Sequence, residues 1–195
     1  MSQQGTPHAT IRIIRAERAA LAAMLRSILM QLAQHRRSGA PPDFAALRAM
    51  LFYIDEFPEK RHHRKESERL FPKLRARAPL SRDLFDQLDD DHDRGERKIR
   101  NVEHALLAFE MMGEARREAF ETAVERYVDF CLAHMALEER EVLPLAERVL
   151  NPQDWAELDR AFGANRDPMT GCEPEAEYAA LFARVVIAVP APAGP

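Results

Sequence analysis

Apolar side chains recur at alternating steps of three and four residues along most of the chain, the spacing that gathers them on one face of an α-helix. Between residues 11 and 25 this spacing gives Ile11, Ile14, Leu21 and Leu25, with Arg18 on the same face. The alternation of polar and apolar residues typical of β-strands is nearly absent, and glycine is scarce. The sequence therefore predicts an all-α protein.

Four long helices are predicted, at residues 9–37, 43–76, 81–112 and 114–150. Asp43 and Ser81 are suitable N-caps for the second and third of them. Pro58 and Pro72 fall inside the second helix and are expected to kink or divide it, because proline lacks a backbone donor and clashes with the preceding turn. Long helices of similar length with short connections favour an up-down-up-down four-helix bundle.

The chain beyond residue 150 predicts a smaller, helical extension of the same domain. Asn151 followed by Pro152 is typical of a helix start and opens a short helix that reaches about Phe162. A second short helix, amphipathic, is expected at 175–187, where it can pack within the chain or against a second copy in a homodimer. We expect a flexible arm at 1–8, one domain at 9–187 divided into a bundle (9–150) and two short C-terminal helices (151–187), and a flexible tail at 188–195.

Polar residues interrupt the predicted buried faces near the middle of each long helix. His92 lies on the buried face of the third helix, and Gly95, one turn further, leaves free space beside it. The second helix carries His62, Glu66 and Arg69 where apolar residues should follow. Helix middles meet at one level in an antiparallel bundle, so the sequence predicts one interior layer of Arg18, His62, Glu66, His92, His134 and Glu138.

This layer has two interpretations. Buried imidazoles and carboxylates are costly unless they are paired or bind a metal ion. Three histidines and two glutamates suit a transition metal, which would be iron, manganese or zinc. The alternative is a metal-free polar network in which Arg18 pairs with Glu66 and Glu138.

Composition and charge limit the binding partners and the cellular compartment that are expected for this chain. The 195 residues carry a net charge of -4 without a strongly basic region, which argues against a nucleic-acid-binding protein. No apolar run approaches the roughly 20 residues needed to cross a bilayer, and the amino terminus lacks the plan of a signal peptide. The two cysteines, Cys131 and Cys172, do not form a disulfide framework. We therefore expect a cytoplasmic protein that binds neither nucleic acid nor membrane.

Three stretches, HHRKESERLFPKL, DHDRGERKI and HMALEEREVLPLAERVL, resemble the hemerythrin-like, or HHE cation-binding, family. The resemblance covers about residues 9–186 and implies a four-helix bundle with a non-haem di-iron centre. Carried over by position, it implies terminal ligands at His62, His92 and His134, with Glu66 and Glu138 bridging the two irons. It also places His63 where some relatives have an additional ligand.

Two positions depart from the family pattern, because Arg18 and Arg69 stand where relatives frequently have histidine. A guanidinium group stays protonated and has no lone pair to give to iron. Three outcomes follow from Arg18: a weakened dinuclear site, a mononuclear site at His92, His134 and nearby glutamates, or no metal.

The resemblance implies a non-haem iron protein that binds or senses O2, NO or peroxide, or that handles iron, with a centre altered at Arg18. A metal-free structural or interaction bundle is the alternative. A redox enzyme of the peroxidase kind is a third hypothesis, although nothing in the sequence indicates a pocket for an organic substrate. The expected cofactor is iron, as a pair or a single ion, unless the site has lost its metal.

Overall fold

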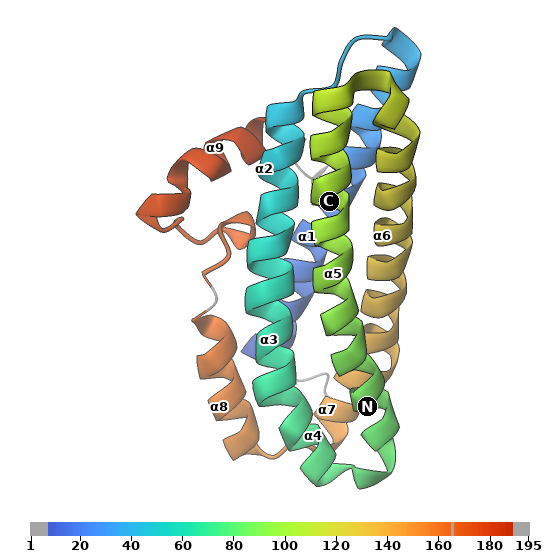
Figure 1. Cartoon of the computed structure of the whole chain (residues 1–195). Coiled ribbons are helices and arrows are strands. Elements are labelled where there is room, and N and C mark those ends of the chain that lie inside the picture. Colours follow the sequence, from blue (N-terminus) through green and yellow to red (C-terminus); the bar gives the residue numbers. More distant parts are fainter. Residues whose placement is uncertain (1–7, 165, 189–195) are drawn as a thin grey trace, which may run out of the picture.

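The computed structural model describes residues 8–164 and 166–188, and within these ranges the regular structure is entirely helical. Figure 1 shows long helical rods lying side by side, as the all-α prediction requires. The rods are α1 (Ala9–Ser38); α2 (Phe44–Ile54), η1 (Asp55–His62), α3 (His63–Lys65), η2 (Glu66–Leu70) and α4 (Phe71–Arg77) in succession; α5 (Arg82–Met112); and α6 (Arg117–Leu137), η5 (Glu138–Val142) and α7 (Leu143–Val149) in succession. The short turns η3 (Pro79–Ser81) and η4 (Gly113–Arg116) connect rods, and α8 (Pro152–Gly163), η6 (Pro168–Thr170), η7 (Ala176–Tyr178) and α9 (Ala179–Ala188) follow.

Helix ends follow local side-chain chemistry at most of the expected positions. The Asp43 carboxylate accepts a hydrogen bond from the backbone N–H of Ala46 at 2.9 Å. Asn151 and Asp154 cap α8 reciprocally, each side chain accepting from the other's backbone N–H. Ser81 precedes α5 but makes no capping hydrogen bond, because η3 delivers it with a near-helical ψ of 18° rather than in the extended conformation that a cap needs. The predicted Ser81 cap is therefore wrong.

The expected breaks at proline take the form of π-helical turns within continuous rods. In η2 the backbone N–H of Phe71 donates to the carbonyl of Glu66, five residues earlier, and Pro72 follows directly. The wider turn accommodates a proline that has no N–H and whose ring would clash with an α-helical carbonyl. The segment η1 contains Pro58, and η5 precedes Pro144 in the same way.

These turns change which side chains face inward. The regular period placed Arg69 on the buried face, but the extra residue in η2 rotates the helix, so that Arg69 is exposed and Leu70 is buried. The sequence prediction for Arg69 is therefore wrong, and its side chain lies outside the interior layer.

Two apolar clusters fill the interior, and the polar layer lies between them. Along α1, Ile14 belongs to one cluster and Leu21 to the other, with Arg18 between the two. Along α5, Leu88 and Ile99 are divided in the same manner, on either side of His92. The layer therefore has packed, water-excluding walls above and below.

The C-terminal extension packs on the outside of the rods, with α8 and α9 on the side of α2 and α3 (Figure 1). Phe182 of α9 contacts Tyr53 and Phe57 edge to face, at ring distances of 5.8 and 5.5 Å, so this helix packs within the chain. The predicted arm (1–8) and tail (188–195) lie, apart from His8 and Ala188, outside the described residues.

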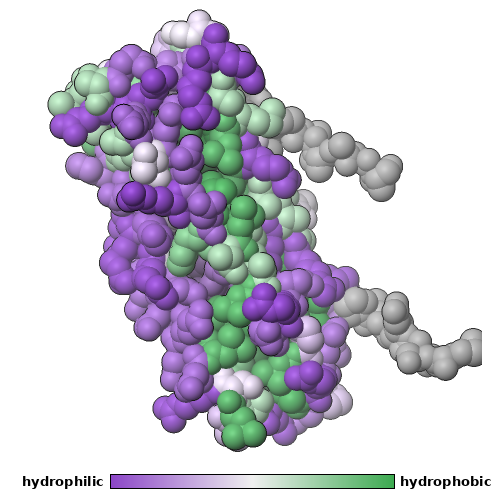
Figure 2. Space-filling model, turned by 90° about the vertical axis from the view of Figure 1, so that its right-hand side faces the viewer, coloured by the Kyte–Doolittle hydropathy of each residue, from purple (hydrophilic) through white to green (hydrophobic). Residues whose placement is uncertain are grey.

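Among the described helices none is both long enough and apolar enough to cross a membrane. Figure 2 views the side on which α6 lies, where hydrophilic side chains flank an apolar strip that runs along the length of the molecule.

Candidate metal centre

The interior layer is formed as the sequence predicted, with every member buried. The most exposed of the six is Arg18 at 8%, and Glu66 is fully buried. The members come from all four rods and are Arg18 (α1), His62 (η1), Glu66 (η2), His92 (α5), His134 (α6) and Glu138 (η5).

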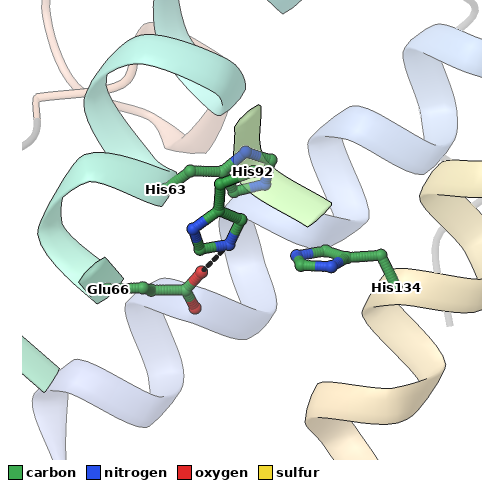
Figure 3. Close-up of side chains that lie close together, drawn as sticks. All are labelled: His63, Glu66, His92 and His134. Atoms are coloured by element: carbon green, nitrogen blue, oxygen red, sulfur yellow. Dashed lines mark ion pairs between the residues drawn. The ribbon is translucent and has the colours of Figure 1, made fainter. Parts of the chain in front are cut away.

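Four side chains form a compact donor group within this layer: His63, Glu66, His92 and His134. Each offers one nitrogen or oxygen atom, and these atoms all lie within 4.8 Å of one another. Figure 3 shows the group converging from three rods, with Nε2 of His92 3.5 Å from Oε2 of Glu66. The imidazoles of His63 and His92 are stacked at 4.2 Å. Imidazole nitrogens with a carboxylate oxygen are a donor set that suits a divalent transition metal.

The other two candidate ligands lie beside this group. His62 approaches it through Nε2, which is 3.2 Å from Oε1 of Glu66. Glu138 places Oε2 3.4 Å from Nε2 of His134 and Oε1 4.0 Å from Nε2 of His92. The sequence predicted His62 as a ligand and His63 as an additional one, whereas the compact group contains His63 and leaves His62 at its edge.

The guanidinium of Arg18 lies between the two glutamates. Its Nη2 atom is 2.7 Å from Oε2 of Glu138 and 3.5 Å from Oε1 of Glu66. A further contact of 3.5 Å joins Nη1 to the partly exposed Glu139. The expected pairing of Arg18 with both buried carboxylates is therefore present.

Several polar atoms facing the centre of the group make no hydrogen bond to any described residue. They are Nε2 of His92, Nε2 of His134, Oε2 of Glu66 and Oε1 of Glu138. Each such buried atom costs about 1 to 3 kcal/mol when it is left unsatisfied. His92, His134 and Glu66 belong to the compact donor group, so a cation held there would satisfy polar atoms that are otherwise buried without a partner, and the residues present fit a bound metal ion.

Two of the histidines are held through Nδ1 by carboxylates. Nδ1 of His62 lies 2.5 Å from Oε2 of Glu17, and Nδ1 of His63 lies 3.0 Å from Oε2 of Glu59. In a neutral imidazole, a carboxylate at Nδ1 keeps the proton there, which leaves the Nε2 lone pair free.

The remaining two histidines differ in what lies beside Nδ1. Nδ1 of His92 lies 2.8 Å from Oγ of Ser67, whose hydroxyl donates to Asp89 at 2.5 Å. Nδ1 of His134 faces Asp91, with 3.8 Å between nitrogen and oxygen. Three of the four imidazoles thus have an oxygen within hydrogen-bond distance of Nδ1, the arrangement commonly found behind metal-bound histidines, whereas Nδ1 of His134 has no hydrogen-bond partner among the described residues.

Glu59 was missed by the sequence analysis, although its spacing of four residues from His63 was available as a signal. Its Oε1 accepts a hydrogen bond from the hydroxyl of Tyr127 at 2.5 Å. A Cβ atom at Gly95 would lie 2.5 Å from Oε2 of Glu59, so the space expected at Gly95 admits this carboxylate. Burial raises the pKa of Glu59 to about 7.

Burial keeps two of the imidazoles neutral. It lowers the pKa of His134 to about 2, and the neighbouring His63 and His92 act in the same direction. Burial likewise holds the pKa of His63 well below its usual value. A neutral imidazole is the form that can ligate a metal ion.

The pKa values of His62, Glu66 and Glu138 are shifted in different directions. Burial lowers the pKa of His62, but the charge of Glu66 and the hydrogen bond that Nδ1 donates to Glu17 outweigh burial and raise it to about 10. Burial would raise the pKa of Glu66, yet the adjacent His62 holds it well below the usual range. Burial and the charge of Glu66 raise the pKa of Glu138 well above its ordinary value. Without a metal ion, the layer is held together by paired charges.

A small, partly enclosed cavity with a volume of about 20 Å³ borders the layer on the side of η1. Its lining includes Arg18, His62 and His63, and also Arg61 and Asp167. Asp167 belongs to the C-terminal extension and accepts a hydrogen bond from the hydroxyl of Tyr53 at 2.8 Å. The cavity has room for about one molecule of the size of water beside the donor group.

Comparison with protein families gives a match to the model described as the hemerythrin HHE cation binding domain, over residues 9–146. The matched residues include the whole interior layer and end within α7. No curated protein and no solved structure matches the chain.

Proposed function

Because this chain belongs to the hemerythrin HHE cation-binding family, we propose that it is a non-haem iron protein built on an up-down-up-down four-helix bundle. The observation that carries the proposal is the set of inward-facing nitrogen and oxygen atoms on His92, His134, Glu66 and Glu138 that lack a hydrogen-bond partner among the described residues. His63, Glu66, His92 and His134 would hold the ion, with Glu138 beside them.

The centre is mononuclear in this proposal, because Arg18 supplies the second positive charge. In a dinuclear centre two cations would neutralise Glu66 and Glu138 together. Here the guanidinium lies between Oε1 of Glu66 and Oε2 of Glu138. It pairs with one oxygen of each carboxylate, so that a single metal ion would suffice to neutralise the rest of their charge.

Bound iron would supply an open coordination position for a small ligand such as O2, NO or peroxide. The small cavity lined by Arg18, His62 and His63 lies beside the donor group and would be the place for such a ligand. The Nη atoms of Arg18 would orient such a ligand by donating hydrogen bonds, and the apolar clusters on either side would exclude bulk water. We propose sensing of a small ligand or handling of iron as the role, in the reducing cytoplasm, where the free thiols of Cys131 and Cys172 would persist.

A metal-free structural bundle is the second candidate, and the 2.7 Å ion pair between Arg18 and Glu138 favours it. It accounts for that pair but leaves Nε2 of both His92 and His134 buried without a partner among the described residues. The metal-binding function accounts for both observations.

The two candidates are separated by the metal content of the purified chain after expression with abundant iron. We expect about one iron per chain for the wild type and a loss of most of it in His92→Ala and His134→Ala. His104→Ala, which removes an exposed histidine from α5, is the matched control and should retain the wild-type content. Fewer than about 0.2 metal ions per wild-type chain would overturn the iron proposal.

A further inference from the structure

A surface groove with a volume of about 930 Å³ runs between α5 and α6, apart from the metal centre. Four cationic side chains line it: Arg94, Arg97, Lys98 and Arg126. One acidic side chain, Glu118, is also present in the lining. The chain as a whole has a net charge of -4, so this concentration of positive charge departs from its overall balance.

The cations of the groove are only partly neutralised by the protein. Arg94 pairs with Asp91 at 2.5 Å, and the ammonium of Lys98 lies 5.3 Å from the ring centre of Phe130. Arg97 and Arg126 make no ion pair with any of the residues in 8–164 and 166–188. Elsewhere on the same helix the exposed Arg100 is paired, to Glu96 at 2.9 Å. The groove therefore holds cationic donors that are free for an external anion.

The shape and remaining lining favour an anion with several phosphate groups. Asn101 and Thr122 add neutral hydrogen-bonding groups, and the small side chains of Ala119 and Ala123 keep the groove open between the helices. A guanidinium presents two parallel N–H donors that match two phosphate oxygens, and its charge is not lost at neutral pH. A groove between two packed helices suits one slender chain rather than a nucleic-acid duplex.

The N-terminus of α6 also favours the binding of an anion in the groove. The lining includes Ala115, just before α6 begins at Arg117, and Glu118 and Ala119 in its first turn. No side chain caps this 21-residue helix, and its N-terminus, where the helix dipole is positive, lies at that end of the groove.

We propose that the groove between α5 and α6 binds a small oligophosphate anion through Arg97, Lys98 and Arg126. The site is separate from the metal centre, because none of these three residues belongs to the interior layer or contacts it. Its failure would therefore leave the iron proposal untouched, and the reverse is also true.

The test is calorimetric titration of the full chain with tripolyphosphate at low salt, with the iron content checked before and after. Arg97→Ala/Arg126→Ala is the informative variant, since Arg94 also contacts Asp91, which faces His134. Arg100→Ala/Arg140→Ala removes the same charge from two exposed arginines that have acidic partners outside the groove. We expect the first variant to weaken binding by about tenfold or more and the control to change it by less than about twofold.

Titrations with ATP and with citrate complete the test. Equal affinity for ATP and tripolyphosphate would identify the phosphate chain as the recognised group. Tighter binding of ATP would identify a nucleotide as the ligand. Either of these two results would support the proposal. Three outcomes would overturn it: no binding to the wild type, equal losses in the two double variants, or binding of the tricarboxylate citrate as tight as that of tripolyphosphate.

Discussion

Nη2 of Arg18 lies 2.7 Å from Oε2 of Glu138 in the interior of the bundle, where a cation from α1 meets a carboxylate from η5. The same nitrogen is 3.5 Å from Oε1 of Glu66, so one guanidinium serves two carboxylates that would otherwise repel each other. Burial and Glu66 raise the pKa of Glu138, and Arg18 opposes that rise. The arginine thus reduces the repulsion between Glu66 and Glu138, as a bound metal ion would also do.

Replacing Arg18 by histidine should allow a second metal ion to bind beside the two glutamates. Arg18→His removes the fixed charge and supplies a lone pair beside Glu66 and Glu138, so we expect the iron content to rise from about one to about two per chain. Arg18→Lys keeps a positive charge without a ligand and should stay at about one. Equal iron contents for the histidine variant and the wild type would show that α1 does not serve a second metal position.

Glu59→Gln tests the support behind His63. The glutamine oxygen can accept a hydrogen bond from Tyr127 or from His63, but it cannot replace both carboxylate oxygens, so the tautomer of His63 is no longer fixed. We expect the affinity for the metal ion to fall by about 10- to 100-fold, measured by competition with a chromogenic chelator. Glu56→Gln makes the same chemical change in η1 without contacting His63 and should leave the affinity near that of the wild type.

The raised pKa of Asp167 predicts that the free energy of unfolding depends on pH. Burial raises the pKa of its carboxyl group from 3.8 to about 6. The folded state therefore keeps the proton more tightly than the unfolded state, and the stabilisation is complete below the unfolded pKa and lost as the pH rises through 6. Relative to Asp167→Asn, the wild type should lose roughly 2 to 3 kcal/mol of unfolding free energy between pH 4 and 6.5.

The measurement is urea unfolding of both proteins across this pH range. The change of hydrogen bonding at Tyr53 and Met169 adds an offset that does not vary with pH, so the slope of the difference carries the test. A difference between the two proteins that stays constant across the range would contradict the prediction.

Gly95→Ala should destabilise the protein although alanine is the better helix former. The added Cβ would lie 2.5 Å from Oε2 of Glu59, and moving that carboxylate disturbs its hydrogen bonds to Tyr127 and His63. We expect a loss of about 1 to 3 kcal/mol in unfolding free energy. Gly163, at the end of α8, has nothing within 4 Å of an added Cβ, so Gly163→Ala should be neutral or stabilise by up to about 1 kcal/mol. Equal effects at the two positions would argue against the proximity of Glu59.

The two cysteines should differ sharply toward thiol reagents. Cys172 is exposed, whereas Cys131 is buried and burial raises its pKa to about 12. Since the thiolate is the reactive form, the native protein should titrate about one thiol per chain and the unfolded protein about two. Rapid reaction of a second thiol in the native state would show that the interior near Tyr127 opens readily.

Helical periodicity predicts the burial pattern well where the helix is regular. The stripe predicted on the third helix is buried throughout in α5: Phe85, Leu88, His92, Gly95, Ile99, Val102, Leu106 and Phe109. No proline falls within α5, so a spacing of 3.6 residues per turn holds over its whole length.

The second rod departs from that spacing, and the sequence prediction fails there. Its π turns rotate successive side chains by an amount that a constant period cannot follow, so Arg69 turns outward while Glu59 and His63 turn inward. Pro58 and Pro72 indicated that the helix would be disturbed, but a proline alone does not tell whether the chain bends, breaks or widens by one residue. The ligand roles of His62, Glu66, His92, His134 and Glu138 stay predictions.

Asp167 lies about 20 residues beyond the stretch that matches the family, yet it lines the cavity next to Arg18 and His62. A chain cut after residue 150 would contain the residues of every long rod and every donor atom but would lack Asp167. Its interior would meet solvent where the full chain meets Asp167. The family match ends at residue 146, yet the cavity beside the metal centre is completed by a residue of the C-terminal extension.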